Sequence, residues 1–118
     1  MSRPVHFEIH GDDPVAATGF YAAVFEWKVE QWGDQRYWLF STGEGPGIDG
    51  AAAPTEDHGQ GVVLTVEVDD LAAALDRVRQ AGGKADQEPS PIPGVGLHAY
   101  ARDPNGVVVG LLQPERAG

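Results

Sequence analysis

The sequence has no cysteine, few basic residues and no long apolar run, and each shortage excludes a class of site or protein. Without cysteine there are no disulfides, no thiolate zinc sites and no thiol nucleophiles. Lys and Arg number 8 against 18 Asp and Glu, and the formal net charge of −10 disfavours nucleic acid and anionic membranes as partners. No run is long enough to cross a bilayer and no signal-peptide pattern opens the chain, so we expect a soluble, cytoplasmic protein.

What the chain does contain is enough for one domain with a real core. It has 118 residues, and 42% of them are hydrophobic, which is ordinary for a globular protein. We predict a single domain over residues 1–118 that consists of two similar modules, at 4–54 and 61–114. The polar, turn-rich linker between them, 55–60, includes His58, which we expect to be solvated.

Each module begins with the same pattern, a strand followed by a capped helix. Residues 5–10 alternate apolar and ionisable side chains, which predicts a strand whose two faces differ. An Asp-Asp-Pro sequence then suits the N-cap and first turn of a helix over 13–25. The strand predicted at 62–68 and the helix predicted at 69–81 repeat this arrangement 69 − 12 = 57 residues later. We therefore interpret the paired aspartates as helix caps and not as catalytic carboxylates.

More β-prone stretches follow each helix. They lie at 27–32, 36–42 and 48–53 in the first module, and at 84–87, 95–102 and 107–112 in the second. Residues 89–93 are proline-rich and cannot form a central strand. The order is therefore β-α-β-β-β twice, with one helix covering one sheet face in each module. The expected core consists of Phe7, Ile9, Phe20, Val24, Leu64, Val66, Leu75 and Val78.

Several short motifs occur together in one order along almost the whole chain. They are His6-Phe7-Glu8-Ile9, Phe20-Tyr21 with Val24-Phe25 and Trp27, Val66-Glu67-Val68-Asp69-Asp70, Ala81-Gly82-Gly83, Ile92-Pro93-Gly94-Val95-Gly96 and Asp103-Pro104-Asn105-Gly106. In this set the chain resembles the vicinal oxygen chelate superfamily, which includes glyoxalase I, bleomycin-resistance proteins and extradiol dioxygenases, and especially its small bacterial members related to lactoylglutathione lyase. The resemblance implies an α+β fold in which two βαβββ modules form a curled mixed sheet around a cleft. It also implies a homodimer, which the aromatic content of residues 20–40 favours. One departure is Glu26, because relatives usually have glycine at the end of the first helix.

The resemblance also identifies positions that would bind a metal ion, and this chain fills few of them. Metal-dependent members take ligands from the first and last strand of each module. His6 occupies the first position, but Val63 stands at the matching position of the second module and cannot coordinate. Gly110 stands at the usual glutamate position, and its equivalent is Gly50, or Asp49 if the register differs by one. Since a tight site needs three or four protein ligands, we predict no tightly bound metal and no cofactor, with His6 and Asp49 as weak candidates.

The residues expected to line a ligand-binding cleft lie on strands of both modules. They are His6, Glu8, Trp38, Thr65, His98 and Tyr100. His98 and Tyr100 are two residues apart, as are Trp38 and Phe40, and an offset of 98 − 38 = 60 relates the pairs. Aromatic walls with a few polar groups suit a planar or amphipathic small molecule.

Each of these assignments has a structural alternative. His6 is explained equally well by a ligand contact, as a base or hydrogen-bond partner, and by a structural hydrogen bond. Glu8 either acts as an acid or base with His6 or neutralises it, and we favour the second. Trp38 and Phe40 are also compatible with a plain core role, and His10, near the strand end, is expected to be exposed.

Three functions remain compatible with these observations. We favour a glyoxalase- or bleomycin-resistance-like protein that binds a small molecule in its cleft without a tightly bound metal. The alternative is a metal-dependent lyase, isomerase or dioxygenase of the same superfamily, and the third is an interaction module without a ligand. No serine nucleophile motif occurs, so catalytic residues stay unassigned and the sequence does not decide whether the protein is an enzyme.

Overall fold

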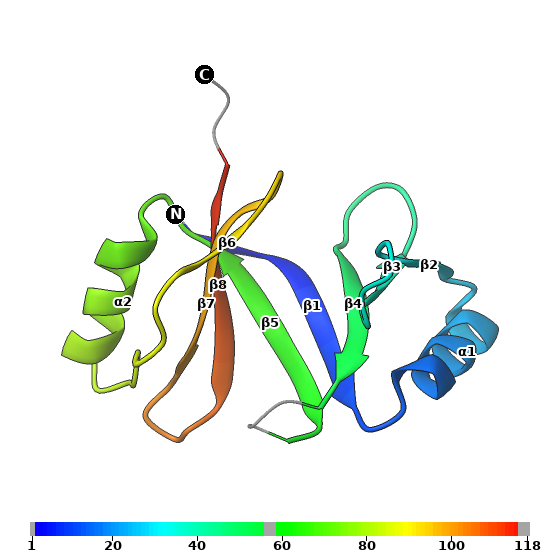
Figure 1. Ribbon diagram of the computed structural model, residues 1–118, viewed down its shortest axis with the longest axis horizontal. Coiled ribbons are helices and arrows are strands. Elements are labelled where there is room, and N and C mark those ends of the chain that lie inside the picture. Colours follow the sequence, from blue (N-terminus) through cyan, green and yellow to red (C-terminus); the bar gives the residue numbers. More distant parts are fainter. Residues whose placement is uncertain (1, 56–58, 116–118) are drawn as a thin grey trace. The chain divides into compact units, whose positions relative to one another are not determined.

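The computed structural model describes residues 2–55 and 59–115, which form two compact units (Figure 1). The first unit comprises residues 5–55 and 59–63, and the second comprises residues 64–115 and 2–4, so the boundaries fall inside the strands at 3–11 and 61–67. His58 of the predicted linker lies outside the described residues. Within the described ranges, no helix is long and apolar enough to span a membrane.

The first unit has the predicted β-α-β-β-β order. Its elements are β1 (Arg3–Gly11), α1 (Pro14–Phe25), β2 (Lys28–Gln31), β3 (Trp38–Ser41) and β4 (Asp49–Pro54). The strands pair in the order β2-β3-β4-β1, with β1 parallel to β4 and the other pairs antiparallel. Helix α1 packs against β4, β3 and β2 (Figure 1). The unit is therefore a mixed four-stranded sheet with one helix on one face.

The second unit repeats this topology. Its elements are β5 (Gly61–Glu67), α2 (Leu71–Gln80), β6 (Ser90–Ile92), β7 (Gly96–Arg102) and β8 (Val108–Pro114), and they pair in the order β5-β8-β7-β6 with β5 parallel to β8. The strand predicted at 84–87 is wrong, because only Lys84 forms an isolated bridge, to Arg102. The short strand is β6, which lies at the sheet edge, where prolines are tolerated.

Both ends of α1 follow from its sequence. Asp13 is the N-cap, and its side chain accepts a hydrogen bond of 3.0 Å from the Ala16 amide, while Pro14 occupies the first turn. At the C-terminal end Glu26 adopts a left-handed conformation, with φ 62°. It is the only residue other than glycine in the described chain with positive φ, a conformation that glycine adopts at lower cost.

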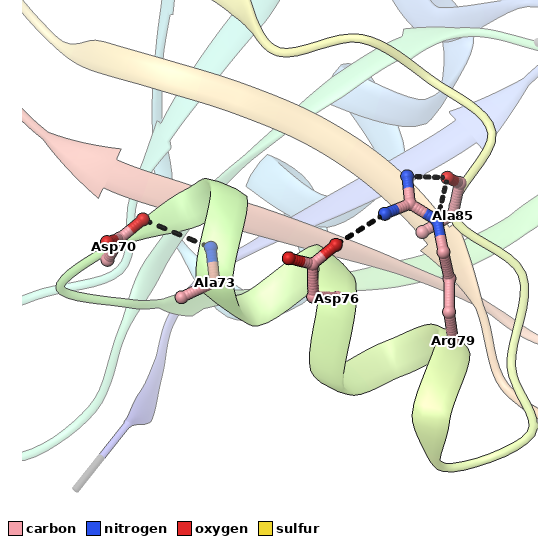
Figure 2. Close-up of polar contacts among 5 residues, drawn as sticks. All are labelled: Asp70, Ala73, Asp76, Arg79 and Ala85. Atoms are coloured by element: carbon pink, nitrogen blue, oxygen red, sulfur yellow. Dashed lines mark hydrogen bonds and ion pairs between the residues drawn. The ribbon is translucent and has the colours of Figure 1, made fainter.

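Side-chain hydrogen bonds stabilise both ends of helix α2 (Figure 2). The Asp70 carboxylate accepts a 3.1 Å hydrogen bond from the Ala73 amide, so Asp70 and not its preceding neighbour is the cap. In the last turn, Arg79 pairs with Asp76 at 2.9 Å and donates from its guanidinium to the Ala85 carbonyl (Figure 2). These contacts tie the end of the helix to the segment that follows it.

The core of the first unit is aromatic. The ring of Tyr21 on α1 stacks on Trp27, with 5.4 Å between centroids, and meets Phe40 edge-on at 5.8 Å. Phe40 in turn stacks on Phe7 of β1, and Phe7 covers Gly50, where an added Cβ would come within 2.5 Å of the ring. A glycine is therefore needed beneath the Phe7 ring.

Two predicted core residues of α1 face solvent instead. Phe20 and Val24 are 58% and 54% exposed, so their assignment to the core is wrong. The buried side of the helix is made by Pro14 and Thr18, with Tyr21 partly buried. Helix α1 carries no charged residue and is apolar around its whole circumference, so the sequence pattern could not indicate which side faces the sheet.

The core of the second unit lies between α2 and the sheet. Its buried members are Val68, Leu71, Ala74, Leu75, Ala85, Ala99, Ala101 and Leu111. Val66 and Val78 pack against this cluster, which confirms these two residues and Leu75 as core. Leu64 is 47% exposed, and it is neither in this cluster nor among the residues packed against it, so its assignment to the core is wrong.

Candidate functional site

The first strand presents its ionisable residues to the sheet face opposite α1. In the parallel pairing of β1 and β4, His6 lies opposite Asp49, while Phe7 lies opposite Gly50. Cross-strand partners share a sheet face, and alternation adds Glu8 and His10 to the face of His6. Phe7 points to the α1 side. We call the face that carries His6, Glu8, His10 and Asp49 the polar face of the first unit.

Four side chains on this face form a continuous hydrogen-bond chain, here called the His6 network. His6 Nε2 lies 2.8 Å from the Tyr37 hydroxyl, which donates to Glu8 Oε2 at 2.8 Å. The other carboxylate oxygen, Oε1, lies 2.8 Å from His10 Nε2. Glu8 is 7% exposed and His10 is 3% exposed, so the expectation that His10 is solvated is wrong. Glu8 reaches His6 through Tyr37, and its direct partner on β1 is His10.

Tyr37 is the residue that sequence reasoning missed, because Trp38 was grouped with His6 instead. Trp38 lies opposite Ala52, which lies opposite Ile9, so all three point to the α1 side of the sheet. The grouping of Trp38 with His6 is therefore wrong. The signal that could have identified Tyr37 was the row of three ionisable residues on β1, because such a row needs a polar partner from a neighbouring strand where it is buried.

The same pairings correct how the two units correspond. Ala51 lies between Glu8 and Leu39, as Gly110 lies between Thr65 and Tyr100. The offset between the third strands is therefore 100 − 39 = 61 and not 60, and His98 corresponds to Tyr37. Gly110 corresponds to Ala51, so neither Gly50 nor Asp49 is its equivalent.

Burial controls the protonation of His6. Desolvation lowers the pKa of the imidazole below its usual value, although the carboxylates of Glu8 and Asp49 each act to raise it. The net shift is downward, so the imidazole is neutral near pH 7. A neutral imidazole has one N–H donor and one lone pair that accepts a hydrogen bond or a proton.

The donor atoms near His6 do not make a metal site. Asp49 Oδ1 accepts hydrogen bonds from the Thr42 amide at 2.8 Å and from the Thr42 hydroxyl at 3.1 Å, so one of its two oxygens is already held. Across residues 2–55 and 59–115, no group of three or more His, Asp or Glu side chains could hold a metal ion. Val63 and Gly110 offer no side-chain donor atom. The residues present therefore do not fit the metal that the superfamily resemblance implies.

In the second unit, the structure brings together the three residues that the sequence grouped. Thr65, His98 and Tyr100 share one sheet face with Gly110, and the rings of His98 and Tyr100 meet edge-on at 4.6 Å. A Cβ on Gly110 would lie 3.0 Å from Thr65 Oγ1 and 3.1 Å from His98 Nε2. The Thr65 hydroxyl is buried and has no hydrogen-bond partner in the described part of the chain. Whether these residues contact a ligand stays a prediction.

Comparison with protein families gives a match over nearly the whole chain. The model of the Glyoxalase/Bleomycin resistance protein/Dioxygenase superfamily matches residues 3–111. Among curated proteins, lactoylglutathione lyase from Salmonella typhimurium is 26% identical over 129 residues, covering 98% of this chain and 96% of that protein. A probable lactoylglutathione lyase from Vibrio cholerae is 36% identical over 55 residues, and this match spans 46% of the chain and 40% of the length of that relative.

Solved structures similar to this one share its fold. Methylmalonyl-CoA epimerase from Mycobacterium tuberculosis superposes with a TM-score of 0.69 and 20% identity, covering 96% of this chain and 88% of the epimerase. A hypothetical protein from Bacillus halodurans superposes with a TM-score of 0.69 and 14% identity, covering 99% of this chain and 97% of its own. A superfamily member from Vibrio splendidus has a TM-score of 0.66, at 17% identity over 94% of this chain and 97% of its own. These similarities agree with the α+β fold of two βαβββ units.

Proposed function

Because the chain belongs to the Glyoxalase/Bleomycin resistance protein/Dioxygenase superfamily, we propose that it binds a small organic molecule through His6 on the polar face, without a tightly bound metal. The observation that carries this proposal is the His6 network. The network fixes the His6 ring at Nε2 through Tyr37 and the buried Glu8 carboxylate. The other ring nitrogen, Nδ1, is left available for a ligand.

Counting protons in the network assigns the tautomer of His6. Tyr37 has one hydroxyl proton, and it is donated to Glu8 Oε2. The Tyr37 oxygen can then only accept from His6, so Nε2 of His6 carries the ring proton. In the neutral imidazole, Nδ1 therefore carries the lone pair, and no described residue is hydrogen-bonded to it. The network thus presents His6 Nδ1 as an acceptor for a ligand.

The low pKa of His6 supports the same role. Since burial keeps the imidazole neutral near pH 7, the lone pair of Nδ1 is not lost to a solvent proton. The ring is also oriented, because it stacks on Tyr37 with an interplanar angle of 15° and 6.4 Å between centroids. An oriented, neutral acceptor suits recognition of an N–H or O–H group, or removal of a proton from it.

A metal-dependent enzyme of the same superfamily is the alternative that the sequence left open. It would need at least one further ligand beside His6 and Asp49, and the Asp49 oxygen Oδ1 is already held by Thr42. We therefore favour binding without metal.

A second candidate function is metal-independent proton transfer. Its support is that the His6 ring is held at Nε2 by Tyr37, which donates to Glu8, while Nδ1 carries the lone pair, an arrangement typical of a general base. The relatives named lactoylglutathione lyase and methylmalonyl-CoA epimerase make a lyase or epimerase reaction the first to assay. Turnover of a bound compound, abolished in His6→Ala, would favour this function over binding alone.

The experiment is a ligand screen with the wild-type protein and two variants. We expect a compound from a small-molecule panel to raise the melting temperature in the presence of a chelator, and His6→Ala to remove that rise while leaving the fold intact. Leu39→Ala is the matched control, because β3 places it on the same face with no part in the network. A rise that requires added metal, or one that survives His6→Ala, would contradict the proposal.

A further inference from the structure

The two residues that face each other at the start of the β1–β4 pair both offer acceptor atoms. His6 Nδ1 has a lone pair, as the proton count above requires, and the partner of His6 across the pair is Asp49. The Asp49 carboxylate lies close enough to raise the pKa of His6, although burial outweighs that effect. Neither His6 Nδ1 nor a carboxylate oxygen of Asp49 can donate a hydrogen bond to a ligand.

The charge of Asp49 is held in place but not neutralised. Its Oδ1 atom accepts two hydrogen bonds from Thr42, which fix the carboxylate without adding positive charge. Among the described residues, no Lys, Arg or His forms an ion pair with Asp49. Glu8 differs, because it accepts hydrogen bonds from both His10 and Tyr37. The polar face therefore contains one buried, satisfied carboxylate and one exposed, uncompensated carboxylate.

We infer that the ligand of the polar face carries a cationic nitrogen donor, an ammonium or amidinium group, which donates to His6 Nδ1 and pairs with the Asp49 carboxylate. This inference rests on the proposed function and names its ligand class. A cation supplies the donors that both atoms need, and charge-assisted hydrogen bonds are the stronger ones. An anion would meet a lone pair and a negative charge, and would gain no donor from either.

The test uses three probes that share one phenyl ring and carry a cationic, a neutral or an anionic polar group. Benzylammonium chloride, benzyl alcohol and sodium benzoate are titrated into the isotope-labelled full chain at constant ionic strength, and the amide resonances of His6 and Asp49 are followed. We expect saturable shifts at both amides with benzylammonium, about tenfold weaker binding of benzyl alcohol, and no saturation with benzoate.

Charge-removing variants identify the group responsible. Asp49→Asn keeps an oxygen for Thr42 and removes the charge, so benzylammonium should bind about tenfold more weakly. Asp34→Asn removes the same charge from an exposed turn of the same unit and should change the affinity by less than about twofold.

The possible failures are distinguishable. Saturable binding of benzoate or benzyl alcohol at His6, stronger than that of benzylammonium, would overturn the ligand class and leave the proposed binding face intact. Equal weakening by the two aspartate variants would attribute the preference to net charge and overturn the role of Asp49. No saturable shift at His6 with any probe would overturn both proposals.

Discussion

Replacing Tyr37 by phenylalanine removes a single oxygen atom from the centre of the His6 network. The Glu8 carboxylate then loses the hydroxyl donor at Oε2, and His6 Nε2–H loses its acceptor. Glu8 is 7% exposed, so water cannot freely replace the lost donor. A hydrogen bond to a charged group is worth roughly 1.5–3 kcal/mol, and Tyr37 itself is only partly buried. We therefore expect Tyr37→Phe to reduce the free energy of unfolding by about 2 kcal/mol.

Urea denaturation near neutral pH measures this loss, and it corresponds to a melting temperature lower by about 8 °C for a domain of this size. Tyr21→Phe is the matched control. The Tyr21 ring packs on Trp27 and Phe40, and its hydroxyl has no hydrogen bond to any described residue. We expect this control to change stability by less than about 0.5 kcal/mol.

Nitrogen chemical shifts of the His6 ring provide a second readout that packing alone would not move. In the wild-type protein they should report a neutral ring protonated at Nε2, and in Tyr37→Phe the two tautomers should approach the mixture of a free histidine. Equal stability losses for the two tyrosine variants, together with an unchanged His6 tautomer, would refute the reasoning about the network.

Four further predictions concern packing, pH, metal and assembly. Gly50→Ala should destabilise the protein by about 1–3 kcal/mol in urea, because its Cβ would meet the Phe7 ring, while Gly19→Ala, in open space on α1, should stabilise it by up to about 1 kcal/mol. His6 has a lower pKa in the folded than in the unfolded protein, so the free energy of unfolding should fall as the pH drops from about 6.5 toward the lowered pKa. The fall should be smaller in His6→Asn, and equal dependence of stability on pH in the two proteins would contradict this prediction. Dialysis against a chelator should leave no stoichiometric nickel or zinc and an unchanged melting temperature; retained metal by elemental analysis would restore the metal-dependent alternative. Light scattering at micromolar protein should give twice the 12.5 kDa chain mass, and Phe20→Glu on the exposed apolar side of α1 should give a monomer; a wild-type monomer would contradict the proposed homodimer.

The fold was predictable because local signals agreed along most of the chain. Helix caps at Asp13 and Asp70 and the alternation on β1 and β5 fixed the two β-α-β-β-β units. The wrong predictions concern segments whose local sequence does not indicate an orientation or a strand. Helix α1 has no polar side to orient it, so Phe20 and Val24 were assigned to the core. The edge strand β6 contains proline, which argued only against a central strand, so residues 84–87 were expected to form the strand instead.

The candidate site was only partly predictable. Alternation along β1 correctly put His6 and Glu8 on one face, because that property belongs to a single strand. The choice between Tyr37 and Trp38 depended on the register between strands, and a shift by one residue exchanges the two faces. That register is set by pairing with β4, whose run of alanines and glycine provides no pattern to read from the sequence. The role of Tyr37 therefore became visible only from the pairing of β3 with β4.

The parallel pairing of β1 with β4 also determines when the polar face can form during folding. His6 lies opposite Asp49, so the first and last strands of the unit are partners, whereas β2, β3 and β4 pair with their chain neighbours. Local hairpins close quickly, and contacts between distant residues come later because more chain entropy is lost. The bond between His6 and Tyr37 spans 31 positions. On the ribosome, the polar face cannot assemble before β4 has left the exit tunnel. Its formation is therefore a late step in the folding of the first unit.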